Sequence, residues 1–214
     1  TVAVKESGSD PDANPRLRLA IANAKGASMP KENIQRAISK GSDKDGASFI
    51  ECTFEGYANG GVAIFLEATT DNQQRTISNV RMYFNKFNGN LGTNGSLSFI
   101  FDRKGIFTIP QGTLDADEFE MEMIEAGAED MQLEDGYYTV TTAMENFGPM
   151  MKRLEALKIE PESAQLQRIP KDTTKLDLES AKKVMRIIEM FEEDDDIQAV
   201  YHNLEMTDEL MDSM

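Results

Sequence analysis

The sequence predicts an α+β protein of three domains, and three patterns carry that prediction. Apolar residues recur at helical spacing within residues 15–40, and runs rich in β-branched and aromatic residues follow at 49–57 and 62–69. Residues 106–169 then read as strand, helix, strand twice over. We therefore expect an N-terminal helical domain at 1–47, a discontinuous α/β middle domain at 48–105 plus 172–214, and an inserted acidic ferredoxin-like βαββαβ domain at 106–171.

The composition limits the classes of protein to which the chain can belong. The chain has 214 residues, of which 40% are hydrophobic, so it can bury a sizeable core. It contains neither a run of about 18 apolar residues nor a secretory signal pattern, so we expect a cytoplasmic protein without a membrane partner. The single cysteine, Cys52, excludes an internal disulfide and an all-cysteine metal site, and it fits a reducing compartment.

Charge is distributed unevenly along the chain. Residues 1–46 carry eight Lys/Arg and six Asp/Glu, residues 47–110 carry five of each, and residues 111–214 carry nine against 27. The net charge of −16 therefore arises in the second half. An acidic protein can still bind phosphate through a local cluster of cations, because salt screens charges beyond about 8 Å. A nucleic-acid contact is thus expected near the N-terminus.

The first 47 residues predict a pair of helices. Asn14 can cap the first helix with Pro15 at its first position, Pro30 restarts the chain as a helix, and Gly41 ends it. Both helices place cations outside their apolar stripes, namely Arg16, Arg18, Lys25, Lys31, Arg36 and Lys40. These side chains can contact phosphates, or they can form an ordinary solvated surface. The spacing alone leaves both interpretations open.

The next segment predicts two strands and a helix. Asn59-Gly60 between the two β-rich runs indicates a hairpin. Asp71 and Gln74 form a capping-box pattern for a helix that runs to about Phe87. Cations on that helix extend the candidate surface, or they face solvent without a ligand: Arg75, Arg81 and Lys86.

Residues 88–96 form a stretch with three glycines and no charge. Exposed glycine amides, with Asn90 and Gly92 among the candidates, can grip a phosphate or sugar oxygen, or the stretch can be a plain connector. Its spacing matches neither a dinucleotide-binding nor a phosphate-binding loop. Residues 97–101 predict a strand directly after it.

The inserted domain and the tail complete the expected architecture. The order is strand 106–109, helix 114–126, strand 129–134, strand 137–142, helix 145–158 and strand 164–169. A helix at 178–193 and a strand at 197–204 are too little to fold alone, so we expect them to return to the middle sheet.

Catalytic and metal sites are not expected. The acidic helix face of Glu118, Glu122 and Glu125 and the run 192–196 lack the pattern of a calcium loop and predict solvated surfaces, which could attract a basic protein. The only histidine, His202, lies in a predicted strand without a nearby nucleophile motif. We therefore predict a protein that is not an enzyme and needs no cofactor.

Several longer motifs resemble a known family. The stretches are DPDANPRLRLAI, MPKENIQRAISKG, FEGYANGGVAIFLEATTDNQQRT and NGNLGTNGSLSFIFDRKG. They closely resemble the YebC/PmpR family, which includes the mitochondrial translational activators of cytochrome c oxidase. The resemblance implies a three-domain, non-enzymatic regulator of gene expression, acting on DNA in transcription or at the ribosome in translation.

The resemblance also bears on the candidate residues. It favours nucleic-acid contact by the cations of the first two helices, with Arg75, Asn90 and Gly92 as weaker candidates. Family members usually open with a strongly basic segment that this chain lacks, and the sequence leaves open whether such a segment precedes Thr1 in the intact protein. The family's GPGG hairpin reads Ala58-Asn59-Gly60-Gly61 here, which remains a competent turn. DNA and RNA both remain open as the target.

Overall fold

The computed structural model describes residues 1–42 and 49–213, which fall into two compact units. The first unit comprises residues 1–46 and 103–167, and the second comprises residues 47–102 and 168–214. Both units are therefore discontinuous in sequence. The boundary expected between residues 47 and 48 lies outside the described residues, and the division of the first unit into two domains remains a prediction.

The first unit begins with three helices, α1 (Val2–Ser7), α2 (Pro15–Gly26) and α3 (Lys31–Ser42). Asn14 caps α2 as predicted, because its side-chain oxygen accepts a hydrogen bond from the Leu17 amide at 3.0 Å. The side-chain amide of Asn14 donates to the carbonyl oxygens of Ala3 and Gly8 at 2.7 and 2.8 Å. This buried side chain thus ties the start of α2 to α1.

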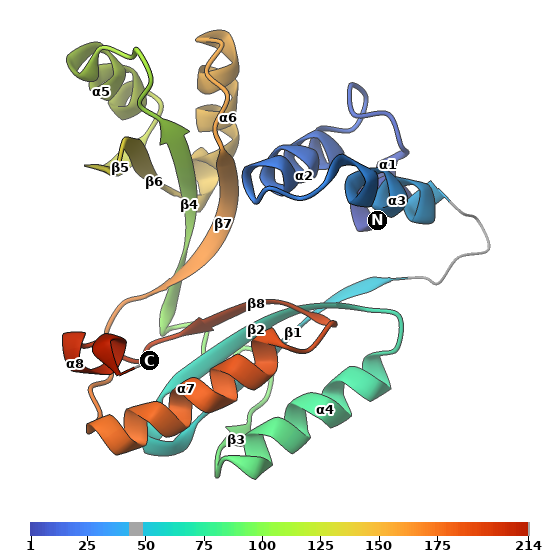
Figure 1. Ribbon diagram of the computed structural model, residues 1–214, viewed down its shortest axis with the longest axis vertical. Helices are drawn as coiled ribbons and strands as arrows, with labels where there is room; N and C mark the ends of the chain where they lie inside the picture. The colour runs from blue at the N-terminus through green and yellow to red at the C-terminus, as the bar shows by residue number, and fades with distance from the viewer. Residues whose placement is uncertain (43–48, 214) are drawn as a thin grey trace. The chain divides into compact units, whose positions relative to one another are not determined.

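The rest of the first unit is built on the sheet of β4 (Phe101–Pro110), β5 (Ala128–Glu134), β6 (Tyr137–Ala143) and β7 (Ser163–Pro170), with α5 (Ala116–Glu125) and α6 (Phe147–Ala156) (Figure 1). The strand order β5-β6-β4-β7 is that of a ferredoxin-like sheet, as predicted. Its core gathers Phe107 and Val140 from the sheet with Phe119 from α5 and Met150 from α6.

Within this unit, α2 docks on the end of β7. The side-chain amide of Asn23 exchanges two hydrogen bonds of 2.9 Å with the backbone of Ala164. Gly26 lies so close to the chain that a Cβ there would meet the Glu162 carbonyl oxygen at 2.1 Å. A residue without a side chain is therefore required where α2 ends.

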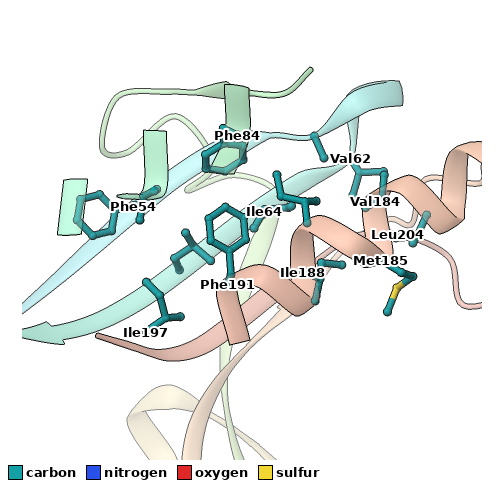
Figure 2. Close-up of a cluster of buried hydrophobic side chains, with 14 of the residues drawn as sticks. Phe54, Val62, Ile64, Phe84, Val184, Met185, Ile188, Phe191, Ile197 and Leu204 are labelled. Carbon is teal, nitrogen blue, oxygen red and sulfur yellow. The ribbon is translucent and has the colours of Figure 1, made fainter. Parts of the chain in front are cut away.

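The second unit contains the sheet β3-β1-β2-β8, built from β1 (Ile50–Tyr57), β2 (Ala63–Thr70), β3 (Asn90–Leu91) and β8 (Ile197–His202). β8 pairs antiparallel with β2, so the tail returns to the middle sheet as expected. The helices α4 (Gln73–Lys86) and α7 (Leu178–Glu192) cover one face, and α8 (Asp208–Asp212) follows. Figure 2 shows Phe84 of α4 and Phe191 of α7 in this core, with ring centroids 5.0 Å apart.

Two local predictions in this unit are wrong. Residues 97–100 form turns and not a strand, and β4 starts at Phe101 and continues through the charged residues 102–104. The turns arise because Leu97 and Phe101 both fold onto the second face of the sheet, beside Phe65. The cap of α4 is Asn72 and not Asp71.

The hairpin prediction is confirmed. A short 3-10 turn, Asn59–Gly61, joins β1 to β2, with Gly60 at a φ of 78°. Within residues 1–42 and 49–213, no helix combines the length and the apolar character needed to cross a bilayer.

Candidate nucleic-acid interface

The cations predicted on α2 and α3 all lie at exposed positions: Arg16, Arg18 and Lys25 on α2, and Lys31, Arg36 and Lys40 on α3. Residues 13–31 contain four cations and no Asp or Glu, and residues 33–42 contain two cations and again no acid. The two helices therefore carry local positive charge on a chain with a net charge of −16.

Some of these cations have carboxylate partners. Arg18 lies 3.7 Å from Glu155, Arg36 lies 3.8 Å from Glu32, and Arg16 pairs with Glu6. Arg36 and Glu32 are 77% and 86% exposed, so water screens their attraction and a phosphate can replace the carboxylate. Among the described residues, Lys25 and Lys31 have no ion-pair partner.

Arg75, predicted as a weaker nucleic-acid contact, is bound by carboxylates. Its Nη2 lies 2.8 and 2.9 Å from the two carboxylate oxygens of Asp196 and 3.0 Å from Asp71. Burial raises the pKa of Asp196, but hydrogen bonds from Arg75 and Thr76 outweigh it and hold that pKa below its ordinary value. Arg75 thus joins the start of α4 to the turn before β8, and any contact with nucleic acid remains a prediction.

Arg81 and Lys86 lie on the outward face of α4. They line an open hollow of about 620 Å³ together with Ser78, Met82 and Asn85. The ammonium group of Lys86 lies 5.6 Å from the centre of the Phe87 ring. Two predicted cations therefore share one surface with an amide and a hydroxyl group, which are groups that suit contact with a phosphate backbone.

The glycine-rich loop holds a carboxylate of the protein itself. The amides of Gly95 and Leu97 donate to the two carboxylate oxygens of Glu55, each at 2.7 Å, and Glu55 is only 4% exposed. Gly92 donates its amide to the Glu55 carbonyl at 2.7 Å, and Asn90 pairs with Tyr57 in the short β3 ladder. The backbone amides of Gly92, Gly95 and Leu97 are therefore unavailable to a phosphate. This favours the connector interpretation for this part of the loop.

Sequence reasoning missed the roles of Glu55 and Asp196. Glu55 is a carboxylate on the face of β1 that also carries Tyr57, and an acidic residue beside an apolar sheet face was a usable signal. The acidic run 192–196 was expected to be a solvated turn, but Asp196 is 8% exposed and Asp194 accepts hydrogen bonds from Tyr83 and Asn79. The turn after α7 folds back onto α4, and its carboxylates satisfy donors there.

The acidic face of α5 is partly neutralised. Arg153 of α6 pairs with Glu122 and, at 3.5 Å, with Glu125. Met121 and Ile124 on the same helix are 62% and 60% exposed. This surface therefore combines carboxylates with an exposed apolar pair.

The remaining titratable groups of residues 1–42 and 49–213 bear on metal binding and on side-chain reactivity. No group of three or more His, Cys, Asp or Glu among the described residues is placed to hold a metal ion. Burial lowers the pKa of His202, so the imidazole is neutral at pH 7. Burial and the charge of Asp196 raise the pKa of the Cys52 thiol, which disfavours the reactive thiolate.

Comparison with known proteins places the chain in a family. A model of the TACO1/YebC second and third domain matches residues 49–204, and a model of the TACO1/YebC protein N-terminal domain matches residues 1–44. A "probable transcriptional regulatory protein" of Amoebophilus asiaticus is 52% identical over 207 residues, covering 95% of this chain and 85% of that protein. A Fusobacterium nucleatum protein with the same description is 45% identical over 216 residues, with coverage of 100% and 87%.

The solved structure of a conserved hypothetical protein from Aquifex aeolicus has the same fold. It matches with a TM-score of 0.81 at 42% sequence identity, covering 98% of this chain and 87% of that one. The matched family models, the relatives and the fold agree, and they show that this chain belongs to the TACO1/YebC family.

Proposed function

We propose that the protein is a non-enzymatic regulator of gene expression that contacts nucleic-acid phosphates through the cations of α2 and α3, with Arg81 and Lys86 of α4 as a second group. The observation that carries this proposal is the set of six exposed cations within the two acid-free stretches of these helices. The relatives named as probable transcriptional regulatory proteins support the regulatory role. The expected cytoplasmic location agrees with this role and stays a prediction.

Phosphate contact suits these side chains better than base readout. Lysine and arginine on exposed helix faces neutralise phosphates and release counterions, which gives affinity without sequence information. Reading bases in the major groove needs a helix that presents Asn, Gln and Arg together toward base edges. On α2 the cations lie among alanines and leucines, so this helix carries no such set.

Neutralising three of these cations tests the proposal. The triple variant K25Q, K31Q and R36Q is expected to bind duplex DNA or single-stranded RNA about 10- to 100-fold more weakly near physiological salt. The slope of log affinity against log salt should become shallower by about 2.7 on duplex DNA or about 2.1 on a single strand, because three phosphate contacts are lost. Fluorescence anisotropy at several salt concentrations measures both quantities.

The matched control removes the same charge from another surface. The variant K182Q, K183Q and R186Q on α7 changes the net charge equally, so it separates a local contact from a global charge effect. It should keep the affinity and the slope of the unaltered protein. Equal losses in both variants would contradict a site on α2 and α3, and affinity that is independent of salt would remove nucleic-acid contact altogether.

A second candidate function is docking of a basic protein on α5. The exposed Met121 and Ile124 favour it, because carboxylates beside them can steer a partner while the apolar pair supplies buried area. Glu118 and Glu120 are the better residues to change in a test of this function, because Glu122 already pairs with Arg153.

We expect the variant E118K and E120K to lose at least about tenfold in affinity for basic ribosomal proteins while nucleic-acid binding is retained. Immobilised protein and purified ribosomal proteins provide the measurement, with the triple glutamine variant of α2 and α3 as the control. Unchanged capture by the α5 variant would exclude this surface.

A further inference from the structure

The aromatic ring of Phe99 is exposed in an unusual way. At 67% it is the most exposed of the large hydrophobic side chains among the described residues. Single exposed apolar side chains are common and need no explanation by themselves. The fixed backbone on both sides of this ring and the chemistry of the neighbouring side chains do need an explanation.

Phe99 stands on a backbone that is fixed on both sides. Leu97 is completely buried and its amide is bound by Glu55, and Phe101 is 5% exposed in the same small core. The carbonyl oxygen of Ile100 accepts a hydrogen bond from the Lys171 amide at 2.9 Å. The backbone that carries the ring is therefore fixed before any ligand arrives, so little backbone entropy is lost on binding.

The segment that leads to this ring is uncharged. Residues 88–101 contain no Asp, Glu, Lys or Arg, in a chain with 38 acidic residues. The exposed side chains that shortly precede Phe99 in the chain are uncharged donors and acceptors, including Thr93, Asn94 and Ser98. An aromatic ring on a segment rich in amide and hydroxyl groups is a suitable platform for a nucleobase.

Lys171 supplies a cation beside the turn that carries Phe99. Its backbone is hydrogen-bonded to Ile100, and its ammonium group lies 3.3 Å from the Asp102 carboxylate. Both side chains of this pair are about half exposed, so solvent screens the pair and a phosphate can compete for the lysine.

We propose that Phe99 stacks on an unpaired nucleobase and that Lys171 contacts a phosphate of the same strand. The inference rests on the proposed function and adds a class of target to it, namely a single-stranded or looped nucleic acid. A base inside a duplex has both faces covered by its neighbours, so only an unpaired base offers a face to the ring.

The absence of tryptophan from this chain allows a direct test. The variant F99W places a single indole at the proposed contact, where stacking on a base should quench its emission. The control Y137W places an indole on β6, at an aromatic residue that is 38% exposed. Titration with mixed-sequence 20-nucleotide RNA and DNA single strands should quench F99W only, and the corresponding duplexes should quench neither.

Binding measurements separate stacking from charge. F99A should weaken single-strand binding about 5- to 150-fold and leave the salt slope unchanged, because stacking does not release counterions. K171Q should make the slope shallower by about 0.7, and the double variant F99W and K171Q should still be quenched at saturation. The thermal midpoint of F99A should match that of the unaltered protein, since the ring is exposed.

Each contrary outcome has a definite meaning. If the unaltered protein binds single strands with salt-dependent affinity, but F99A binds equally well or F99W is not quenched, the stacking inference is wrong and the proposed function stands. If the unaltered protein binds no nucleic acid at any salt concentration, the proposed function fails and the inference fails with it. If F99A loses capture of a protein and not of nucleic acid, the ring is a protein contact and the inference is wrong.

Discussion

Replacing Glu55 by alanine is expected to lower the free energy of unfolding by about 4 kcal/mol, since each of two buried hydrogen bonds to a carboxylate contributes roughly 1.5–3 kcal/mol. The carboxylate accepts from the amides of Gly95 and Leu97 at 2.7 Å each. Its removal leaves these donors without a partner and releases the loop that carries Phe99. Urea denaturation followed by circular dichroism measures the loss.

Glutamine at this position should cost less than alanine. The variant E55Q keeps one acceptor oxygen but presents an NH₂ group to the other backbone amide, so about half of the loss is expected. The control is E189A, at an exposed position within α7, where the change should stay within about 0.5 kcal/mol. A loss in E55A no larger than in E189A would contradict the role given to this carboxylate.

The change of Asp196 to alanine should destabilise the protein by about 2 kcal/mol, because hydrogen bonds to a buried charged group contribute about 1.5–3 kcal/mol while the half-exposed Arg75 returns to water. The carboxylate binds the Arg75 guanidinium at 2.8 Å and accepts a hydrogen bond from the Thr76 hydroxyl at 2.8 Å. Asp195 is the next residue, it is exposed, and D195A should have almost no effect. Equal effects of the two substitutions would show that the network contributes nothing to stability.

The same carboxylate should make stability depend on pH. Its pKa in the folded protein lies below the ordinary value of 3.8, so the unfolded state binds the proton first as the pH falls. Its stabilisation is therefore complete at neutral pH and is lost as the pH drops below about 4 toward the lower pKa of the folded state. D196N should be less stable at neutral pH and should lose less further stability in acid, which thermal unfolding at pH 7, 4 and 3 can measure.

Features set by neighbouring residues could be predicted from the sequence. Asn14 and Pro15 start α2, and Asn59-Gly60 turns the chain between β1 and β2, because capping and turn geometry depend on a few adjacent residues. The order of elements after residue 101 also predicted the ferredoxin-like sheet, since alternating periods of hydrophobicity identify strands and helices. The return of β8 to the middle sheet followed from the need to bury a tail too short to fold alone.

The turns at residues 97–100 could not be predicted from neighbouring residues. The run from Leu97 through Phe99 to Phe101 is apolar or aromatic at four of its five positions, which is typical of a strand. The structure instead buries the first and last of these residues and exposes the middle one, because Glu55, more than forty positions earlier, binds the loop amides. No local pattern contains that contact.

The sequence by itself determined the family, the α+β class, most helices and strands, and the concentration of cations on α2, α3 and α4. Only the tertiary structure decided which charged groups are used internally, because hydrogen bonds such as Arg75 to Asp196 join residues 121 positions apart. The periodicity of a helix shows that a side chain points away from the core. It cannot show whether a carboxylate from a distant segment pairs with that side chain at the surface. In the folded protein, Arg75 and the glycine-rich loop therefore bind carboxylates of the protein itself, whereas Lys25, Lys31 and Phe99 stay exposed.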